Sequence, residues 1–422
     1  MIPLAYRLVT LLAHKTPLPR GKLATSLAGR RAASTRWVEW AFSNRTAGQL
    51  VWVHAASVGE SLTAIPVINR LKAHNPSLQI AHSFTSPSYE SWSGSIPADS
   101  SDYLPLDEPR TIADVFGALR PSLVVCSRGD LWPEMAFASV ARQIPIAIIS
   151  GTVRPGSRRL LRPARRALSP TYECISWLGA ASDGDALRWS QLGVFENAIV
   201  VTGDTRHDQV LERVSNLQPV RALFQWARSR PVLVAGSTYA RDEKLLLEAF
   251  SRVSVSAPGS CLILVPHDCS EHRISEVHNL ARRAGLGVEV WSGGSQIPST
   301  RCVIVNMTGV LTDIYATGRI AYVGGGFRRG GIHAVSEPAA FGIPVIVGPH
   351  FECSSDASLV VAAGGGEALP PQGGAEFLTR LWLNWLEQDQ VRIAAGLKAR
   401  SVLQEGASDV TVGALLQLLD LH

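Results

Sequence analysis

Short apolar runs rich in β-branched residues alternate along the chain with longer segments of helical character. In the first half the runs cover residues 50–56, 79–84, 122–127, 144–150, 174–181 and 198–203, and in the second half residues 231–237, 261–267, 287–292, 302–307, 320–326 and 344–350. Apolar strands that alternate with helices are typical of parallel sheets covered on both faces. A polar helical region near residues 208–229 separates the two sets. The pattern therefore predicts an α/β fold with two doubly wound domains.

The length of the chain agrees with two domains, because 422 residues exceed what one ordinary core accommodates. Apolar residues make up 46% and charged residues 18%, which indicates a globular protein. We place the boundary near residues 207–220 and expect domains of residues 1–210 and 211–422. The last helices, from about residue 376 onward, are expected to pack on the second domain.

Charge indicates the kind of partner that the protein binds, and cysteine content indicates its redox setting. The net charge is only +5, but arginines cluster near the amino terminus and around residues 154–166, which favours an anionic surface or substrate. Nucleic-acid-binding signatures are absent and the charge is local, so we expect no nucleic-acid partner. Six cysteines without CxxC spacing indicate reduced thiols and a cytosolic setting rather than disulfides or zinc.

The first residues, "MIPLAYRLVTLLAH", are apolar but interrupted by Arg7. The segment is shorter than the roughly 20 residues of a bilayer span and lacks a secretory cleavage site. Two arrangements are open: the segment lies flat on anionic lipid, or it packs on the domain as a terminal helix. The first would use the cations that follow, which are Lys15, Arg20, Lys22, Arg30 and Arg31.

The stretch "WVHAASVGESLTA", residues 52–64, places a carboxylate at a strand-to-helix turn. Gly59 permits unusual backbone angles, and Glu60 falls in the first helical turn, where free N–H groups and the helix dipole favour its anion. Glu60 then either completes a capping box with Ser57 or accepts a proton from a substrate hydroxyl. His54, at the end of the strand, receives no role.

The segment "YVGGGFRRGGIHAVSEPAAFGIPVIVGPH", residues 322–350, joins three glycines, a basic loop, a histidine and a helical glutamate. Glycines let backbone N–H groups approach a phosphate, and Glu337, four residues after His333, can accept two hydroxyls of a ribose. These features outline a nucleotide-sugar site. The alternative is a structural glycine-rich turn with a buried capping glutamate.

Several motifs together resemble a known family. They are "WVHAASVGE", "YLPLDEPR", "LWPE", "VTGDTRHD", "VAGST", "LVPHD", "NMTGVLTDIY" and "VGGGF…GGIH…EPAAFGIPVIVGPH". In their order and spacing they resemble the 3-deoxy-D-manno-octulosonic acid (Kdo) transferases of lipopolysaccharide assembly, over about residues 1–410. The resemblance implies a GT-B fold with two Rossmann-like domains facing across a cleft.

The resemblance also implies an activity. Such enzymes move Kdo from CMP-Kdo to a lipid A precursor at the cytoplasmic face of the bacterial inner membrane, with inversion and without a metal or cofactor. We accordingly expect a peripheral or amino-terminally anchored protein that contacts an anionic membrane surface through basic segments of its acceptor-binding first domain. "RPGSRRLLRPARRALSP", residues 154–170, with six arginines and no acid, is the candidate lipid contact.

Site residues follow from the same resemblance. Glu60 is the general base. The acceptor-binding candidates are Ser57, Gly59, Arg128 and Asp130. The donor-binding candidates are Ser237, Thr238, Pro266, His267, Met307, Gly309, Leu311, Gly324, Gly325, Gly326, His333 and Glu337.

Three departures set this chain apart from the family pattern. Arg128 and Asp130 of "RGDLWPE" stand where two glutamates are usual, Ala334 replaces an asparagine, and the "VPHD" loop lacks an arginine. Two alternatives therefore remain. One is a degenerate paralogue that binds lipid or nucleotide without turnover, and the other is an enzyme of the same fold that uses a UDP-sugar, either a transferase or an epimerase.

Overall fold

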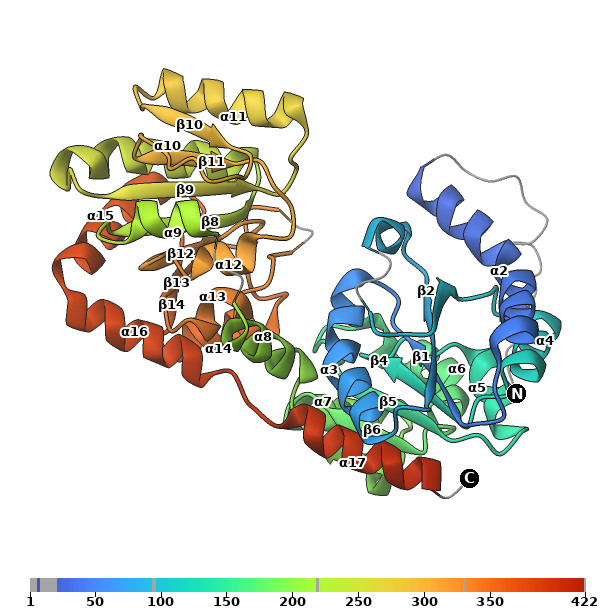
Figure 1. Ribbon diagram of the computed structural model, residues 1–422. Helices are drawn as coiled ribbons and strands as arrows, with labels where there is room; N and C mark the ends of the chain where they lie inside the picture. Colours follow the sequence, from blue (N-terminus) through green and yellow to red (C-terminus); the bar gives the residue numbers. More distant parts are fainter. Residues whose placement is uncertain (1–5, 8–20, 93–95, 218–219, 329–330, 421–422) are drawn as a thin grey trace. The chain divides into compact units, whose positions relative to one another are not determined.

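The computed structural model describes residues 6–7, 21–92, 96–217, 220–328 and 331–420 (Figure 1). Its contacts divide the chain into two compact units. The amino-terminal domain comprises Met1–Gln209 and Gln404–His422, and the carboxy-terminal domain comprises Val210–Leu403. Each domain contains a parallel sheet, so the prediction of two doubly wound α/β domains is confirmed.

The sheet of the amino-terminal domain has the strand order β3-β2-β1-β4-β5-β6-β7, and every recorded pairing is parallel. Its strands are β1 (Leu50–His54), β2 (Gln79–Phe84), β3 (Ser100–Tyr103), β4 (Leu123–Ser127), β5 (Ile146–Gly151), β6 (Trp177–Ala180) and β7 (Ile199–Val201). The order reverses at β1, which pairs with β2 on one side and β4 on the other. In open parallel sheets, ligands bind beyond the carboxyl ends of strands at such a reversal.

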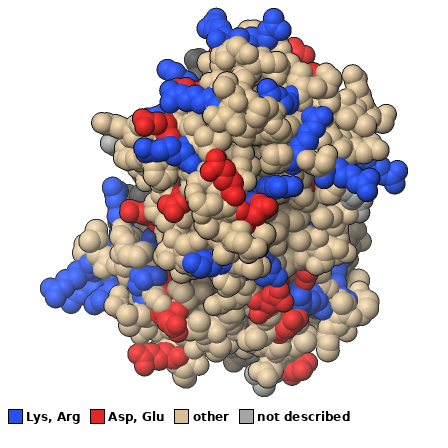
Figure 2. All heavy atoms as spheres, turned by 90° about the vertical axis from the view of Figure 1, so that its left-hand side faces the viewer, with Lys and Arg blue, Asp and Glu red and all other residues tan. Residues whose placement is uncertain are grey.

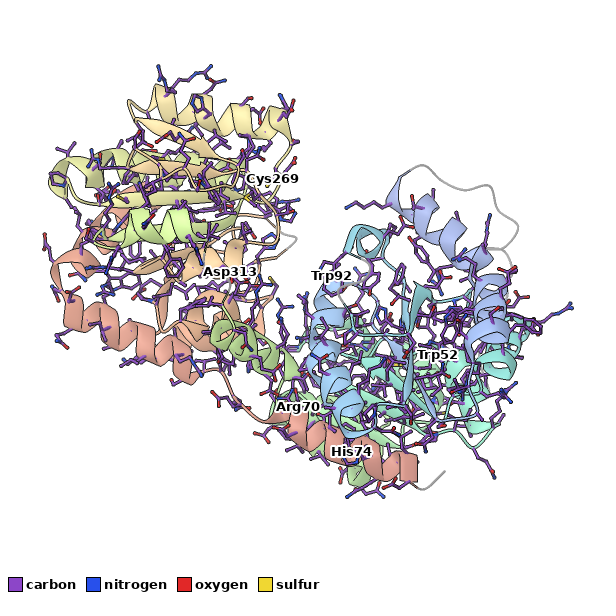
Figure 3. All side chains as sticks on the ribbon, viewed as in Figure 1. Trp52, Arg70, His74, Trp92, Cys269 and Asp313 are labelled. Atoms are coloured by element: carbon purple, nitrogen blue, oxygen red, sulfur yellow. The ribbon has the colours of Figure 1, made fainter. Side chains whose placement is uncertain are left out.

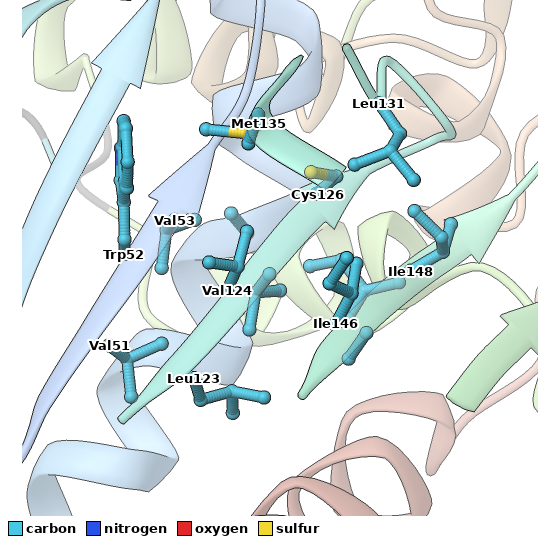
Figure 4. Packing of buried hydrophobic residues seen from close by; sticks show 14 of the residues in the cluster. Val51, Trp52, Val53, Leu123, Val124, Cys126, Leu131, Met135, Ile146 and Ile148 are labelled. Carbon is cyan, nitrogen blue, oxygen red and sulfur yellow. The ribbon is translucent and has the colours of Figure 1, made fainter. Parts of the chain in front are cut away.

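Helices alternate with these strands along the chain. They are α2 (Lys22–Asn44), α3 (Val58–His74), α4 (Pro109–Leu119), α5 (Pro133–Val140), α6 (Arg162–Tyr172), α7 (Asp183–Leu192) and α17 (Ala407–Asp420), with short 3-10 turns η1 (Pro87–Trp92), η2 (Arg158–Leu160) and η3 (Glu196–Ala198). Helix α8 (Thr205–Ser215) begins in this domain and continues from Val210 into the carboxy-terminal domain. The central strands are fully buried apolar runs. Figure 4 shows the side chains of β1, β4 and β5 packed with Met135 of α5.

The carboxy-terminal domain repeats this plan with the order β10-β11-β9-β8-β12-β13-β14. Its strands are β8 (Val232–Thr238), β9 (Cys261–Pro266), β10 (Val288–Trp291), β11 (Cys302–Val305), β12 (Ile320–Val323), β13 (Val345–Val347) and β14 (Gly366–Ala368). The helices are α9 (Arg221–Ala227), α10 (Ala240–Ser256), α11 (Glu271–Arg283), α12 (Leu311–Tyr315), α13 (Ser336–Ala340), α14 (Ser355–Ala362), α15 (Gly374–Glu387) and α16 (Asp389–Ser401). Here the reversal lies at β8, between β9 and β12.

Successive residues of β8 belong to two different cores, as expected for a sheet that is covered on both faces. Val232 and Val234 pack with residues of α9, α12, α13, α14 and α16. Leu233 and Ala235 pack with residues of α10, α11 and α15. Each side of this sheet therefore has its own helical layer.

The last helix departs from expectation. Helix α17 packs on α3 of the amino-terminal domain, so the prediction that all helices after residue 376 pack on the second domain is wrong for α17. Asp208 anchors the return of the chain, because its carboxylate accepts hydrogen bonds from the N–H groups of Gly406 at 2.8 Å and Ser408 at 2.6 Å. Leu415 and Leu419 of α17 are then buried in the amino-terminal core.

The basic amino-terminal segment is described only in part. Residues 1–5 and 8–20 lie outside the described residues, and with them most of the candidate lipid-binding segment. Arg30, which we counted among its lipid-facing cations, is buried in the domain, so that part of the prediction is wrong. Its guanidinium stacks on Trp132 at 4.2 Å and donates to the carbonyl of Leu104 at 3.1 Å. No helix of the described residues is long and apolar enough to span a bilayer.

Candidate active site

The loop between β1 and α3 places Glu60 at the carboxyl end of the strand where the amino-terminal sheet reverses. Ser57 is the N-cap of α3 by its backbone, but its side chain makes no capping hydrogen bond. Instead the Glu60 carboxylate accepts a hydrogen bond from the N–H of Ala56 at 2.7 Å. The reciprocal capping box considered for Ser57 and Glu60 therefore does not form. The Ala56 hydrogen bond instead fixes the Glu60 side chain to the loop that precedes α3.

The environment of Glu60 makes its carboxylate more basic than usual. Burial raises the pKa, the charge of Asp130 raises it further, and the Ala56 hydrogen bond, His54 and Arg128 oppose the shift only in part. The net direction is upward, opposite to the effect that the helix dipole alone would have. A carboxylate with a raised pKa is a better proton acceptor.

His54, unassigned from the sequence, is part of this site. The chain of contacts begins at Trp52 on β1 (Figure 3), whose indole N–H donates to the Ser83 hydroxyl at 3.0 Å. That hydroxyl lies 3.0 Å from His54 Nδ1, and His54 Nε2 lies 3.1 Å from an Asp130 carboxylate oxygen. The backbone carbonyl oxygen of Ser83 also lies 3.0 Å from Nδ1, so the two ring nitrogens of His54 bridge Ser83 of β2 and Asp130.

Asp130 stays anionic in this network. Burial raises its pKa, but the hydrogen bond and charge of His54 and the charge of Arg30 outweigh burial, and the net shift is downward. The pKa values of the two carboxylates near the end of β1 are thus shifted in opposite directions, so Asp130 is the stronger acid and Glu60 is the stronger base. Such a split is a recurrent feature of acid–base sites.

Arg128 is paired within the protein. Its guanidinium donates to the buried carboxylate of Asp204 at 2.5 Å, and its backbone is left-handed with φ 57°. Burial raises the pKa of Asp204, but Arg128 and His207 outweigh this effect and lower it. Arg128 therefore fixes the "VTGDTRHD" segment beside the site, a contact that its sequence position did not predict.

The backbone angles at residue 59 do not require a glycine. It lies in the first turn of α3 without a positive φ, and a Cβ added there would meet no atom within 4 Å. The expectation of an unusual backbone conformation is therefore wrong. Because Gly59 has no side chain, the space next to Glu60 stays open.

In the carboxy-terminal domain a cavity of about 600 Å³ lies beyond the ends of β8, β9 and β12. It is lined by Thr238, Tyr239, Ala240, Arg241, Asp242, His267, Asp268, Arg273, Phe327 and Arg328. Thr238 and His267 belong to the predicted donor site. The others were not predicted, although Phe327 and Arg328 belong to the glycine-rich segment that the sequence singled out. Cys269, in the loop after β9, is labelled in Figure 3.

His333 joins this cavity through its ring contacts. Its Nε2 lies 3.0 Å from the Tyr239 hydroxyl, and its ring centroid lies 4.6 Å from that of His267. Burial, then the charges of His267 and Arg328, lower the pKa of His333 to about 4. His333 is therefore neutral at physiological pH and serves as a hydrogen-bonding group.

The three glycines after β12 are used mainly for close packing. A Cβ on Gly324 would stand 2.2 Å from the Ser237 carbonyl oxygen, and one on Gly326 would stand 2.6 Å from the Gly348 nitrogen. The N–H of Gly324 donates to the Gly236 carbonyl, and that of Gly325 donates to Asp242. Two of the three N–H groups that we expected to face a phosphate thus already have protein acceptors.

Six predicted donor residues remain. Glu337 on α13 accepts a hydrogen bond from the Thr312 hydroxyl of α12 at 3.0 Å. Leu311 begins α12, Gly309 precedes it with φ 80°, Met307 lies against Gly293, and Pro266 ends β9. Ser237, at the end of β8, is left-handed with φ 53°. None of these six lines the cavity beside Tyr239.

All six cysteines are free thiols, which confirms the expectation that none forms a disulfide. Among the residues that the structure describes, no group of three or more His, Cys, Asp or Glu side chains could hold a metal ion.

Comparisons with known proteins show what this chain is similar to. Residues 30–209 match the family model of the 3-deoxy-D-manno-octulosonic acid transferases (Kdo transferases). The chain is 26% identical to a 3-deoxy-D-manno-octulosonic acid transferase of Haemophilus influenzae over 99% of its own length and 95% of the relative. It is 28% identical to the enzyme of that name from Bordetella pertussis, over 74% of each chain.

The fold is shared with a solved structure of another activity. The crystal structure of UDP-GlcNAc 2-epimerase from Neisseria meningitidis matches 88% of this chain and 100% of that chain, with a TM-score of 0.66 and 14% identity. At this identity the match supports the GT-B assignment, with two Rossmann-like domains, and nothing about the reaction. The sequence relatives confirm both the family resemblance and the predicted enzyme class: the chain is related over nearly its whole length to the Kdo transferases, which are glycosyltransferases.

Proposed function

We propose that the protein is an inverting glycosyltransferase of lipopolysaccharide synthesis that moves Kdo from CMP-Kdo to a lipid A precursor, without a metal or cofactor. The observation that carries the proposal is the Glu60 carboxylate. It lies at the carboxyl end of β1, its pKa is raised, and Asp130 remains anionic beside it. The relatives that are 3-deoxy-D-manno-octulosonic acid transferases support Kdo as the transferred sugar.

In the proposed reaction the acceptor hydroxyl gives its proton to Glu60 as its oxygen forms a bond to the anomeric carbon of Kdo. The bond between that carbon and the phosphate oxygen of CMP breaks, and CMP leaves as an anion. The carboxy-terminal domain holds the donor, with Glu337 as a candidate acceptor of ribose hydroxyls. Hydrogen bonds to the departing phosphate stabilise it in the transition state.

We further propose that the protein acts peripherally at the cytoplasmic face of the inner membrane. Support comes from α6, where Arg162, Arg165 and Arg166 are exposed, and from its N-cap residue Leu161, which keeps 59% of its surface exposed. An exposed arginine-rich helix with an apolar side chain fits an anionic lipid surface. On the face drawn in Figure 2, by contrast, cationic and anionic side chains are interspersed.

The experiment compares the wild type with Glu60→Gln and the control Glu39→Gln, an exposed site in α2 of the same domain. Purified protein is incubated with CMP-Kdo and lipid A precursor, and released CMP and the glycolipid mass are measured. We expect CMP release to fall at least about 10³-fold in Glu60→Gln and to be unchanged in Glu39→Gln.

The fold should survive this change. Because burial and Asp130 raise the pKa of Glu60, its ionised form opposes folding once the pH rises above its unfolded pKa. Glu60→Gln should therefore unfold at neutral pH with a free energy equal to or above that of the wild type. Donor binding without CMP release in the wild type would instead support the non-catalytic paralogue, and release of UDP from a UDP-sugar would support the other alternative.

A further inference from the structure

The cavity beyond β8 contains two guanidinium groups that are not neutralised by carboxylates. Arg328 lies over the Tyr239 ring at 4.2 Å, and Arg241 lies over the Phe327 ring at 4.6 Å. Within the described part of the chain, neither arginine forms an ion pair. A guanidinium has five N–H donors, and one that is stacked on an aromatic ring presents them in its plane to a carboxylate or phosphate. Arg241 uses one of these donors on the carbonyl of Pro371 at 3.3 Å.

The third arginine of the cavity has a different role. Arg273 contacts Glu243, and it also donates to Glu276 at 2.6 Å. Its charge is therefore compensated within the protein, and it supports the wall between α10 and α11.

The carboxylates of the cavity do not cancel the charge of Arg241 and Arg328. Asp242 is 1% exposed and accepts hydrogen bonds from Tyr322 O–H at 2.7 Å, Tyr239 N–H at 3.0 Å and Gly325 N–H at 3.1 Å. It occupies the amino end of α10, so that terminus is not free to bind a ligand. Asp268 is exposed at the rim and accepts from the Ser270 N–H.

His333 adds a hydrogen-bonding group rather than a charge. His333 is neutral at physiological pH, as described above, and its ring contacts those of Tyr239 and His267. The cavity thus offers an aromatic and imidazole wall with two stacked guanidinium groups. This combination suits an oxyanion attached to a ring or sugar.

We propose that Arg241 and Arg328 bind an oxyanion of the sugar-nucleotide donor, either the phosphate of CMP or the carboxylate of the transferred sugar acid. This inference rests on the proposed function, because it takes the donor from it. The positive charge comes from Arg241 of α10 and from Arg328 of the loop after β12. The loop after β9 carries no arginine and does not contribute to it.

Isothermal titration of the full-length chain tests the proposal with cytidine, CMP and CMP-Kdo as ligands. The variants are Arg328→Gln and Arg241→Gln. The matched control is Arg230→Gln, which removes a guanidinium stacked on Trp226 at 5.2 Å outside the cavity. Thermal unfolding of each variant checks that the domain remains folded.

If the oxyanion is the phosphate, each cavity variant should weaken CMP binding about tenfold and leave cytidine binding unchanged. If it is the sugar carboxylate, CMP-Kdo should weaken by a similar factor and CMP should not. The control should bind all three ligands as the wild type does. Folded variants that bind CMP and CMP-Kdo with wild-type affinity would overturn the proposal.

The outcome for the wild type separates this inference from the proposed function. A wild type that binds no cytidine nucleotide but binds UDP in an Arg328-dependent manner would overturn the proposed donor and retain the anion site. A wild type that binds neither class of nucleotide would overturn both.

Discussion

At the residue scale, the two carboxylates beyond β1 determine how activity should respond to pH. Asp130 loses its proton first, because the hydrogen bond and charge of His54 lower its pKa, and its negative charge then helps to raise the pKa of Glu60. A general base must be deprotonated, so activity should fall as the pH drops through the raised pKa of Glu60.

Asp130→Asn should therefore move the acidic limb of the profile of kcat/KM against pH to lower pH, because the charge that raises the pKa of Glu60 is gone. The profile of Asp114→Asn, an exposed site in α4, should match the wild type. A limb that stays in place or moves to higher pH in Asp130→Asn would show that Asp130 does not act on the base.

The ion pair between Arg128 and Asp204 permits a second prediction. Arg128→Gln leaves the buried Asp204 carboxylate without its cation, which should lower the free energy of unfolding by about 1–3 kcal/mol, given that the Arg128 side chain is 26% exposed. The double variant Arg128→Gln/Asp204→Asn should recover part of this loss in urea denaturation. A raised KM for the acceptor with unchanged stability would instead favour acceptor binding by Arg128.

Single residues were predicted unevenly from the sequence. Glu60 could be proposed because its motif, its place after a strand and its chemistry agree. The pairing of Arg128 with Asp204 could not, because the two residues are 76 positions apart and only the sheet brings them together. Arg241 was missed for a similar reason: it lies in an ordinary helical sequence, and only its stacking on Phe327 places it at the cavity.

At the scale of elements, glycines with similar sequence settings differ in what they require. Gly324→Ala should lower the stability of the carboxy-terminal domain by about 1–3 kcal/mol or more, because its Cβ would collide with the Ser237 carbonyl. Gly59→Ala should be neutral or stabilise by up to about 1 kcal/mol, since the position is helical and open. Thermal unfolding compares the two, and equal losses would contradict the packing difference.

The strands followed the apolar pattern except at two edges. All twelve apolar runs overlap strands, but β3 and β14 were not predicted. β3 has the sequence SSDY and β14 the sequence GEA, and each lies at the edge of its sheet. An edge strand is only partly covered, so polar residues are tolerated there and the pattern loses its signal.

At the scale of the whole molecule, α17 ties the two ends of the chain to one domain. Leu415→Ala removes a fully buried side chain from the amino-terminal core and should destabilise that domain by about 2–5 kcal/mol. Val410→Ala on the same helix, where the side chain is 53% exposed, should change stability by less than about 0.5 kcal/mol.

Hydrogen exchange resolved by peptide gives the measurement. In Leu415→Ala the peptides of β1 and α3 should exchange faster, while those of β8 and β9 remain as in the wild type. Faster exchange in β8 and β9 alone would contradict the assignment of α17 to the amino-terminal domain.

The two-domain plan could be predicted because each set of apolar runs is long enough to define a sheet. The return of α17 could not, because its sequence is apolar enough to pack on either domain. The choice is made by polar contacts such as those of Asp208 with Gly406 and Ser408, which no periodicity reveals.

This return also has a consequence for biosynthesis. Because residues 404–422 belong to the first domain, the carboxy-terminal domain is an insertion within it. During translation, α3 emerges from the ribosome long before α17. Until α17 follows, the nascent first domain exposes the apolar surface that Leu415 and Leu419 later cover, so its core is completed only after the carboxy-terminal domain has been synthesised.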